Sequence, residues 1–552
     1  MNGNSLLVIP LGGIEEIGLN MTVFRYADDM FIVDCGLMFP EEDMPGVDFV
    51  VPDFSYVLEH KDKIRGVILT HGHEDHTGAL PFLLDGLKAP VYGTPLTLAL
   101  VRDKLDEYKI TDVSLVPVKP RGTIQLGVFK VEFIRVTHSI VDGVALGIQT
   151  PIGNVIHTGD FKLDPTPVDG ELMDFHKFAE YGENGVVLML SDSTNAEKGG
   201  FTFSEKEVRR AFEDIFYKKK GRIIIATFAS NIHRIQQVID VARQFGRRVM
   251  MCGRSMVTNS QIALELGYLK IPPETWVKLD KLKDMDDSEV VIITTGSQGE
   301  PMSVLARIAV GEHKEIKIKD GDTVILSAKM IPGNERSIGK IINHLMRKGA
   351  DVIYEKVSEI HVSGHASKEE LKLMMNMVRP RYFMPIHGEY RHLKYHMRLA
   401  EKSGIPSENI FILENGAVLE ITEEGASVKG RVSSGRILID GKGSPAVEDV
   451  VLRDRKQLGE DGIVIVLLGM EAATKKILFG PEIISRGFIL EDASQDLLIE
   501  VRDLTANTIS ELEESLKSDV SHVSAKLRST LKKYLRNRMD RRPMIMPLIV
   551  EL

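Results

Sequence analysis

The chain has 552 residues, too many for one ordinary hydrophobic core, so we expect about two to four domains. Its 43% hydrophobic and 27% charged residues are typical of globular proteins, and its two cysteines, Cys35 and Cys252, exclude a disulfide framework or a cysteine-rich zinc module. The formal net charge of −10 argues mildly against indiscriminate nucleic-acid binding, although phosphate contacts depend on the local potential.

The first residues, MNGNSLLVIPLGG, lack the basic and apolar regions of a signal peptide. The chain also has no run of about eighteen apolar residues, the length that a membrane-spanning helix needs. The low cysteine content favours a reducing compartment. We therefore expect a cytoplasmic protein that makes no membrane contact.

Short β-rich segments separated by Gly, Asp and Pro turns occupy about the first two hundred residues. Several of them, such as FKVEFIRVTHS, alternate apolar and polar residues with period two. Their close spacing predicts a pair of sheets rather than a repeated βαβ array. A helix is expected at 95–107, and GGIEEIG (12–18) is expected to be a turn, since no Gly-Lys-Ser/Thr follows it as in a phosphate-binding P-loop.

From residue 204 the pattern changes to alternating strands and helices. Ser204, followed by Glu205 and Glu207, is a favourable helix start. The alternation predicts a doubly wound α/β segment, in which ligands bind at the carboxyl ends of the strands.

Short strands return at 409–440, and a Gly/Ser/Pro-containing linker is expected at 441–447. A last α/β segment runs from 448 to 552. Its basic stretch, 526–543, is either a solvated helix face or a contact for RNA.

HGHEDH (71–76) concentrates four side chains that can bind a metal: His71, His73, Asp75 and His76. Their spacing differs from the i, i+4 spacing of helical metal motifs and suits a loop that folds around a metal centre. Two imidazoles with a third nitrogen or oxygen donor make an open zinc site, and the adjacent Asp/His pair can begin a second site.

Three more donors, His138, Asp160 and His387, each follow an apolar β-like run far away in the sequence. One such residue alone would more often be a satisfied polar group than a ligand. Together with the clustered quartet, however, the three distant donors predict a dimetal centre. Two close divalent ions lower the pKa of a shared water and neutralise the charge that develops on a phosphoryl group.

HGHEDH resembles the hallmark motif of the metallo-β-lactamase fold, an αββα sandwich with two zinc ions at one edge. This resemblance implies that His71, His73 and His138 bind one metal, that Asp75, His76 and His387 bind the other, and that Asp160 bridges them. It also implies a catalytic role for Asp75 in orienting the metal-bound hydroxide. The sandwich alone does not determine the substrate.

The α/β segment at 204–368 interrupts this predicted metal domain, because His387 follows it. It resembles the β-CASP insertion of enzymes that process nucleic acids, with Asp192, His365 and His387 at that family's landmarks. The motifs that carry the closer resemblance are PLGGIEEIGLNM, HTGDFKLDPTPVDG, SDSTNAEKGGFTFSE, TTGSQGEPMSVLARIA, IPGNE and HVSGHASKEE. Over nearly the whole chain, these motifs are similar to those of bacterial ribonuclease J. The chain departs from that pattern at Lys329, Met330 and Val141, where Ser-like or Pro-like residues are expected.

The resemblance implies an α/β architecture with these boundaries: a metallo-β-lactamase domain at 1–203 and 369–440, a β-CASP domain at 204–368, a linker at 441–447 and a small C-terminal domain at 448–552. It implies a ribonuclease that degrades RNA from 5′-monophosphate ends and also cuts internally, in mRNA decay and rRNA processing. Two Zn²⁺ per chain are expected, with Mn²⁺ or Mg²⁺ as alternatives, and the resemblance admits a structural Ca²⁺. The implied partners are single-stranded RNA, further copies in a homodimer or homotetramer formed through the C-terminal domain, and members of an RNA-degradation complex.

Several residues are candidate RNA contacts. Ser363, Gly364 and His365 are expected at the scissile phosphate, where His365 can protonate the leaving oxygen. For His361 a second interpretation stays open, in which His361 and His365 cap the helix that begins near Ser367.

The loop GSQGEP (296–301) resembles the family's 5′-phosphate pocket, so Ser297 and Gln298 are candidates, with an ordinary glycine turn as the alternative. The segment FASNIHRIQQ offers Ser230, Asn231, His233 and Arg234 at a strand–helix junction, with helix capping by Ser or Asn as the competing interpretation.

Three other functions compete with an RNA nuclease. A β-CASP enzyme can cut DNA, because the 2′-hydroxyl contact that distinguishes RNA is not readable from sequence. A small-molecule hydrolase of the same fold has no need of the insertion. A metal-free RNA-binding scaffold would be expected to lose metal ligands, yet all seven are present.

Overall fold

The structure is a computed structural model that describes residues 5–41, 43–300, 302–329, 334–355, 360–441, 449–471, 477–489, 495–512 and 519–551. Most of the predicted linker 441–447, Met330 and the first three residues of the IPGNE motif lie outside the described residues. The chain divides into two compact units, Met1–Phe39 with Val50–Ile437 and Pro40–Phe49 with Leu438–Leu552. None of the helices in the described part of the chain is long and apolar enough to cross a membrane.

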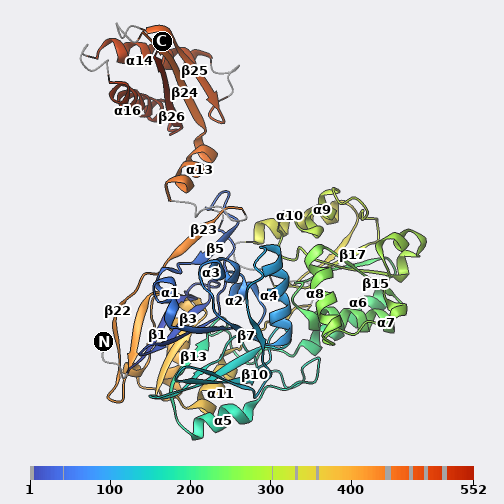
Figure 1. Ribbon diagram of the computed structural model, residues 1–552. Coiled ribbons are helices and arrows are strands. Elements are labelled where there is room, and N and C mark those ends of the chain that lie inside the picture. The colour runs from blue at the N-terminus through green and yellow to red at the C-terminus, as the bar shows by residue number, and fades with distance from the viewer. Residues whose placement is uncertain are drawn as a thin grey trace. The chain divides into compact units, whose positions relative to one another are not determined.

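Unit 1 contains two sheets that face each other (Figure 1). The eight-stranded sheet has the order β22 (Ala426–Arg431), β21 (Ala417–Ile421), β1 (Leu6–Gly12), β3 (Met21–Tyr26), β4 (Asp29–Val33), β6 (Ile64–Ile68), β7 (Val91–Gly93) and β8 (Leu115–Pro117). The six-stranded sheet has the order β19 (Tyr382–Ile386), β13 (Val186–Asp192), β12 (Gly153–His157), β11 (Val144–Thr150), β10 (Phe129–Arg135) and β9 (Thr123–Leu126). Both sheets contain parallel and antiparallel pairs.

Alternation of side chains along the strands builds two cores. On β10, Phe129, Val131 and Phe133 point into the core between the sheets, whereas Ile134 belongs to the core on the opposite face. Phe31 of β4 joins the two sheets because its ring meets that of Phe129 edge to face, with ring centroids 4.9 Å apart. This alternation is the period-two pattern of half-buried strands.

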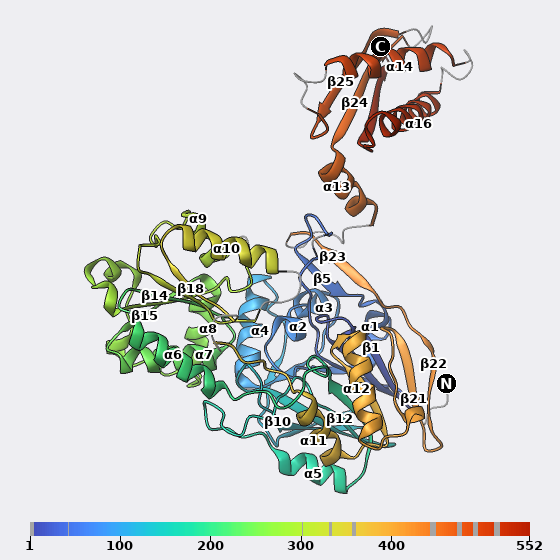
Figure 2. The same cartoon turned by 180° about the vertical axis from the view of Figure 1, so that it is seen from behind.

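Helices cover the outer faces of both sheets, which completes an αββα sandwich and confirms the predicted fold class (Figures 1 and 2). The eight-stranded side carries α1 (Ser55–Glu59), α2 (Glu74–Thr77), α3 (Leu80–Gly86) and α4 (Pro95–Glu107). The six-stranded side carries α5 (Phe175–Glu183), α11 (Lys368–Val378) and α12 (Tyr390–Lys402). The helix expected at 95–107 is α4, with the same bounds.

A five-stranded, wholly parallel sheet has its own core within unit 1. Its order is β15 (Arg248–Cys252), β16 (Val290–Thr294), β14 (Ile223–Ala226), β17 (Thr323–Leu326) and β18 (Asp351–Ile353). One face packs on α6 (Glu205–Lys218), α7 (Ile232–Gln244) and α8 (Arg254–Glu265). The other face packs on α9 (Val304–Val310) and α10 (Glu335–Arg347), so the segment is doubly wound, as predicted. The proposed boundaries of 204–368 for a separate domain stay a prediction.

Unit 2 contains a three-stranded sheet with the order β25 (Ile477–Arg486), β24 (Ile463–Met470) and β26 (Met544–Glu551). The helices α14 (Gln495–Ser510) and α16 (Val520–Met539) pack on one face of this sheet, and α13 (Asp449–Asp461) precedes it. The other short elements in the described ranges are β2 (Ile14–Glu15), β5 (Phe49–Pro52), β20 (Gly388–Glu389), β23 (Arg436–Ile439) and the 3₁₀ turns Lys61–Lys63, Pro273–Thr275, Leu279–Asp284, Asp287–Glu289 and Ser407–Asn409.

Candidate metal centre

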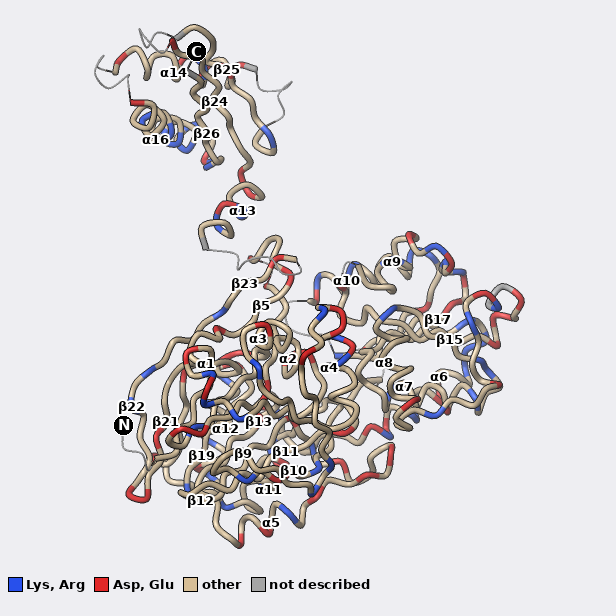
Figure 3. The backbone as a smooth tube through the Cα atoms, viewed as in Figure 1, with Lys and Arg blue, Asp and Glu red and all other residues tan. Residues whose placement is uncertain are grey.

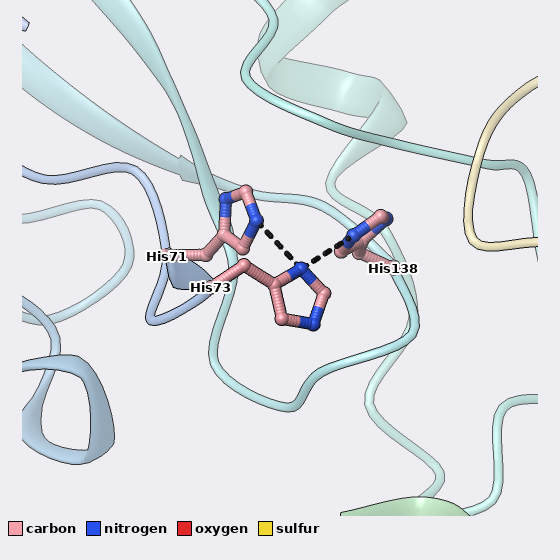
Figure 4. Close-up of side chains that lie close together, drawn as sticks. All are labelled: His71, His73 and His138. Carbon is pink, nitrogen blue, oxygen red and sulfur yellow. Dashed lines mark hydrogen bonds between the residues drawn. The ribbon is translucent and has the colours of Figure 1, made fainter. Parts of the chain in front are cut away.

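Three imidazoles converge where β6 and β10 end (Figure 4). The Nδ1 atom of His73 lies 3.0 Å from Nε2 of His71 and 3.2 Å from Nε2 of His138. Nitrogen atoms bound to one tetrahedral zinc at about 2.0–2.1 Å are about 3.3 Å apart, so these separations suit a shared ion. The structure brings together the three residues predicted for the first metal.

A second group of donors lies beside the first and comprises Asp75, His76, Asp160 and His387. The Oδ2 atom of Asp160 lies 3.3 Å from Nε2 of both His76 and His387. Asp75 reaches the same two nitrogens at 3.6 and 3.8 Å. Its carboxylate is 31% exposed, whereas the other three side chains of this group are buried.

Asp160 lies between the two groups. The same Oδ2 atom is 3.8 Å from Nε2 of His71 and 3.8 Å from Nε2 of His138. One carboxylate oxygen therefore faces imidazoles of both groups, the position expected for a ligand that bridges two metals.

Hydrogen bonds fix the imidazole tautomers so that lone pairs face the centre. His138 donates its Nδ1–H to the carbonyl of Gly364 at 2.7 Å, and His387 donates its Nδ1–H to Oδ1 of Asn20 at 3.0 Å. The partner atoms are acceptors, so each histidine carries a proton on Nδ1 and turns its Nε2 toward the centre, where a metal can bind. A Cβ at Gly364 would lie 2.6 Å from the His138 ring, so this close approach requires glycine.

Asp34 orients two of the predicted ligands. Its Oδ2 accepts from Nδ1 of His76 at 2.8 Å and from the hydroxyl of Thr70 at 2.9 Å. Because the Thr70 proton is used in that bond, its oxygen is left to accept from Nδ1 of His71, 3.1 Å away. Asp34 also accepts from the amide of Thr70 and is buried.

Sequence reasoning missed Asp34 and Asn20. Asp34 comes directly after the buried strand β4, and Asn20 comes directly before β3, both in the eight-stranded sheet. A polar residue at a strand end is the same signal that identified His138 and Asp160, so Asp34 could have been found in this way. Asn20 could not, because its partner His387 is 367 residues away in the sequence.

The first group binds protons weakly. Burial, together with neighbouring imidazoles, lowers the pKa of His71 and of His138 well below the usual value for histidine. Burial lowers the pKa of His73 to about 4. These three rings are therefore neutral near pH 7, the form that binds a metal.

In the second group, the Asp160 carboxylate favours the protonated forms of His76 and His387. Burial opposes protonation of His387, but the Asp160 carboxylate raises its pKa to about 9. Asp160 and Asp75 likewise raise the pKa of His76 against the effect of burial. The two imidazoles in turn hold the pKa of Asp160 well below its usual range, despite burial. A cation bound here would replace these protons.

His365 lies at the edge of the centre. Its Nδ1 is 2.8 Å from Oδ2 of Asp192, and its ring centroid is 5.0 Å from that of His138 and 5.5 Å from that of His387. Asp160, Asp192, His365 and His387 form a third possible donor set, which shares two members with the second. The direct bond between Asp192 and His365 favours a proton-transfer pair instead.

The loop that carries His365 is held by Asn195. The Nδ2 group of Asn195 donates to Oγ of Ser363 at 2.8 Å and to the carbonyl of His365 at 2.9 Å. Ser363, Gly364 and His365 are therefore fixed beside the metal ligands.

The helix-capping interpretation of His361 and His365 is wrong. The helix α11 is capped by Ser367 and Glu370, which form a reciprocal capping box. His361 is largely buried, and its Nδ1 has no hydrogen-bond partner in the described part of the chain. Burial and the charge of Arg234 lower its pKa to about 3.

The remaining candidate RNA contacts lie at the carboxyl edge of the five-stranded sheet, on loops and in the first turn of α7. Ser297 and Gln298 are buried, and Nε2 of Gln298 donates to the carbonyl of Lys329 at 2.7 Å. Asn231 caps α7, since its Oδ1 accepts from the amide of Arg234 at 2.9 Å, so the capping interpretation holds for this residue. Ser230 precedes that cap and is half-buried, and Nε2 of His233 lies 3.1 Å from Oδ2 of Asp169.

Two hollows adjoin the metal donors. A cavity of about 10 Å³, large enough for about one water molecule, borders His76, Asp160, His387 and the turn at Gly13. The segment 12–18, which was predicted to be a turn and contains the short strand β2, therefore begins beside the metal donors. A pocket of about 380 Å³ extends from His138 toward His233 and is lined by more carboxylates than basic groups. Its charge therefore disfavours binding of a nucleic-acid backbone.

Comparison with known protein families gives four matches along the chain. They are the Metallo-beta-lactamase superfamily at 16–225, the Ribonuclease J beta-CASP domain at 220–345, the Zn-dependent metallo-hydrolase RNA specificity domain at 349–413 and the Ribonuclease J C-terminal domain at 450–552. These matches agree with the fold class and with the insertion seen in the structure.

Similar proteins match over nearly the full length. Ribonuclease J 1 of Streptococcus pyogenes is 43% identical over 548 residues, which cover 99% of this chain and 98% of that protein. Ribonuclease J of Thermus thermophilus is 44% identical over 554 residues, covering 99% and 95%. Ribonuclease J2 of Bacillus subtilis is 41% identical over 554 residues, covering 100% and 99%.

A crystal structure of a protein of unknown function from Enterococcus faecalis matches the fold, with a TM-score of 0.55 and 15% identity over 76% of this chain and 100% of that one.

Proposed function

This chain belongs to the ribonuclease J family, and on that premise we propose that it is a zinc-dependent ribonuclease that hydrolyses RNA phosphodiester bonds. The finer proposal is a 5′→3′ exonuclease that prefers 5′-monophosphate ends and also cuts internally, in mRNA decay and rRNA processing. The observation that carries the proposal is the convergence of seven metal donors beside the His365–Asp192 pair, next to a doubly wound insertion.

The donor set fits two zinc ions. His71, His73 and His138 would hold one ion, Asp75, His76 and His387 the other, and Asp160 would bridge them. When bound, such a pair supplies a hydroxide at neutral pH and neutralises charge on the phosphoryl oxygens. The nitrogen separations and the fixed tautomers support this fit.

His365 and Asp192 supply the leaving-group chemistry. Because Nδ1 of His365 is engaged by the Asp192 carboxylate, Nε2 is the atom that carries a transferable proton. Asp192 stabilises the imidazolium, and Nε2–H protonates the 3′-oxygen as its bond to phosphorus breaks. Asp75, the most exposed carboxylate of the centre, is placed to accept a hydrogen bond from the attacking water. The downstream product then carries a 5′-phosphate.

RNA contacts are proposed at two places. Ser363, Gly364 and His365 would meet the scissile phosphate, since Asn195 fixes this segment beside the ligands. Ser297 and Gln298 would contact the 5′-phosphate, and Ser230, His233 and His361 are proposed as further contacts along the RNA. The carboxyl ends of parallel strands are where such sheets bind ligands, which supports the second site.

The remaining expectations belong to the same proposal. Single-stranded RNA is the substrate, the cytoplasm is the compartment, and copies of the chain assemble through the C-terminal domain as a homodimer or homotetramer. Mn²⁺ or Mg²⁺ as alternative metals, a structural Ca²⁺ and membership of an RNA-degradation complex stay predictions.

The deciding experiment compares oligonucleotides of one sequence that carry a 5′-monophosphate, carry a 5′-triphosphate or are made of DNA, with Zn²⁺, Mn²⁺ or Mg²⁺ supplied. We expect about two zinc ions per chain and cleavage of RNA only, fastest for the monophosphate. His76→Ala should abolish cleavage and reduce the metal content while the circular dichroism spectrum is unchanged. Equal cleavage of DNA would favour a DNA nuclease, and protein without metal binding would contradict the mechanism.

A further inference from the structure

A buried carboxylate that the proposed chemistry does not use lies next to the His365 loop. Glu370, in the first turn of α11, is fully buried. A charged side chain removed from water usually lies beside an opposite charge. In the part of the chain that the structure describes, however, Glu370 forms no ion pair, and backbone amides bind its carboxylate instead.

These amides come from three segments that are far apart in the sequence. Oε1 of Glu370 accepts from the amide of Leu163 at 2.7 Å. Oε2 accepts from the amides of Thr202 and Ser367, both also at 2.7 Å. All three bonds are shorter than the usual length of about 2.9–3.0 Å for an amide donor, as is typical when the acceptor is ionised. One carboxylate therefore joins three segments of the backbone.

Two of these segments carry groups of the proposed reaction. Leu163 comes three residues after Asp160, the proposed bridging ligand. Ser367 comes two residues after His365, the proposed proton donor. Glu370 thus connects the backbone next to a metal ligand with the backbone next to the proton donor.

The third segment connects His365 with Asp192. Thr202 lies on the loop that follows Asp192, and its hydroxyl donates to the carbonyl of His365 at 2.8 Å. Asn195, on the same loop, donates its side-chain N–H to that carbonyl at 2.9 Å. Because Glu370 binds the amide of Thr202, it also supports the loop that holds the His365 ring against Asp192.

We propose that Glu370 is a positioning residue of the reaction, which holds His365 at the distance from Asp160 at which its Nε2–H can protonate the leaving 3′-oxygen. Nδ1 of His365 lies 3.9 Å from Oδ2 of Asp160. The inference rests on the proposed ribonuclease function and extends it to a residue that touches neither metal nor RNA.

The substitution Glu370→Gln separates this role from capping of α11. Glutamine at the third position of a helix also completes a capping box, so the bond from the amide of Ser367 is kept. Glutamine has one acceptor oxygen where the carboxylate has two. With that oxygen turned to Thr202 and Ser367, its NH2 group faces the amide of Leu163, donor against donor. The variant therefore loses the connection to the Asp160 segment.

The test compares an oligoribonucleotide with the same oligoribonucleotide in which sulfur replaces the 3′-bridging oxygen of the scissile linkage. A thiol has a pKa of about 8.5, far below that of an alcohol, so a thiolate leaves without being protonated. Cleavage of the sulfur linkage therefore does not need the proton of His365, and a defect in positioning His365 should disappear there.

Two further variants complete the set. Thr202→Val removes the hydroxyl bond to the carbonyl of His365 and leaves the buried carboxylate in place. Glu369→Gln is the matched control, since it makes the same change one residue earlier, in a carboxylate that pairs with Lys372 at the surface at 2.8 Å.

Glu370→Gln should lower kcat for the ordinary linkage at least about tenfold and change KM less than about twofold, because a small displacement of the proton donor affects the transition state more than binding. For the sulfur linkage, kcat should stay within about twofold of the wild-type value. Thr202→Val should show the same difference at about threefold, and Glu369→Gln should match the wild type on both linkages. Equal losses on both linkages, or wild-type rates on both, would overturn the proposal.

Hydrogen exchange measured by mass spectrometry on the zinc-loaded protein supplies a readout that does not depend on cleavage. In Glu370→Gln, peptides that contain Leu163 and the segment 363–367 should exchange faster, whereas the last turns of α11 should be unchanged. Unchanged exchange at both places would overturn the proposal. If exchange is faster but the wild-type protein cuts neither linkage, the proposed ribonuclease function is wrong, and the positioning role is overturned with it although the connection between the segments stands.

Discussion

At the scale of single residues, Asp34 connects ligands of both proposed metal sites without being a proposed ligand itself. It is bonded directly to His76 and, through Thr70, to His71. These two histidines belong to different proposed metal sites, so one carboxylate orients a ligand of each ion. Its backbone has a φ of 61°, an uncommon conformation for a residue other than glycine, which the three hydrogen bonds to the side chain maintain.

Replacing Asp34 with Asn should therefore weaken zinc binding without removing a ligand. The amide keeps the shape of the side chain but replaces an acceptor oxygen by a donor, so the His76 tautomer is no longer fixed. Loss of such an orienting partner typically costs 10–100-fold in metal affinity, and we expect a loss of about that size. Zinc content after dialysis against graded chelator measures it, and excess zinc should restore much of the cleavage activity.

The matched control is Asp112→Asn, which changes an exposed carboxylate paired with Lys88 at the surface. Zinc affinity should be unchanged in that variant. Wild-type zinc affinity in Asp34→Asn would show that the His76 ring is held by its other contacts.

At the scale of elements, a buried charge cluster joins the starts of two helices. Glu205 is the first residue of α6, and its carboxylate accepts from Nη2 of Arg234, in the first turn of α7, at 2.8 Å. Arg234 is fully buried and also donates to Ser327 and to the carbonyl of Ile360. Lys162, which follows β12 of the sandwich, lies 3.9 Å from the other oxygen of Glu205. The cluster thus connects the sandwich to the doubly wound segment.

This cluster predicts a specific dependence of stability on pH. Burial opposes ionisation of Glu205, but Arg234 and Lys162 lower its pKa to about 2 from the ordinary value of 4.5. Because the pKa of Glu205 is lower in the folded state than in the unfolded chain, its ionised carboxylate stabilises the fold at every pH above the unfolded-state pKa. This contribution is lost as the pH falls from about 4.5 toward 2. Glu205→Gln leaves two buried cations without their partner and should cost about 3 kcal/mol at pH 7.

The measurement is the midpoint of urea unfolding between pH 7 and pH 3, with EDTA present so that metal loss does not contribute. The difference between wild type and Glu205→Gln should be constant down to about pH 4.5 and shrink below it. Glu207→Gln, on the exposed face of α6 beside Arg210, is the control and should change stability by less than about 1 kcal/mol. A difference that persists unchanged at pH 3 would contradict the prediction.

Local patterns predicted individual elements well, because their causes lie within a few residues. The helix α4 has the predicted bounds, and Ser204 caps α6 as its sequence indicates. The metal donors could be predicted for a similar reason, since four are adjacent and three follow apolar runs. The structure brings all seven together.

Long-range features could not be predicted in this way. Asn20 and His387 are 367 residues apart, and the burial of Lys162 depends on Glu205 and the carbonyl of Phe203, which no local pattern places beside it.

At the scale of the whole molecule, the division into units differs from the order of the sequence. Residues Pro40–Phe49 belong to the same unit as Leu438–Leu552, where Lys456 pairs with Asp43 at 2.8 Å. A C-terminal segment expressed alone would lack this stretch, so experiments on assembly require the full chain.

The helix α16 supplies both a core face and a basic face to this unit. Val523, Leu527, Leu531 and Leu535 repeat every four residues and are buried against the sheet. The lysines and arginines of α16 are exposed. Figure 3 shows how many of them there are along this helix. This explains the basic stretch as a solvated helix face, and its proposed contact with RNA stays a prediction.

The opposite face of the three-stranded sheet is apolar and exposed. Met546, Leu548 and Val550 alternate along β26 and are 37%, 44% and 48% exposed. Among the residues that the structure describes, β26 pairs with β24 alone and is therefore an edge strand of the sheet. An exposed apolar edge strand readily pairs with another chain, and proteins usually cover such an edge or interrupt it with charge. A second copy of the chain, pairing its own β26 face, is the occupant expected from the proposed homodimer.

Leu548→Glu should therefore separate the copies, because two glutamates would be brought together in an apolar contact where neither has a cation. At micromolar concentration, size-exclusion chromatography with light scattering should give the wild-type protein a mass in solution of at least twice the 61.5 kDa of one chain. The variant should have the mass of a smaller assembly, with unchanged circular dichroism, since Leu548 does not contribute to the core of the unit. Val428→Glu, at an exposed apolar position on β22 of unit 1, should leave the mass unchanged. A wild-type monomer, or a Leu548→Glu variant of undiminished mass, would mean that the copies meet elsewhere or not at all, and that the β26 face has a different partner.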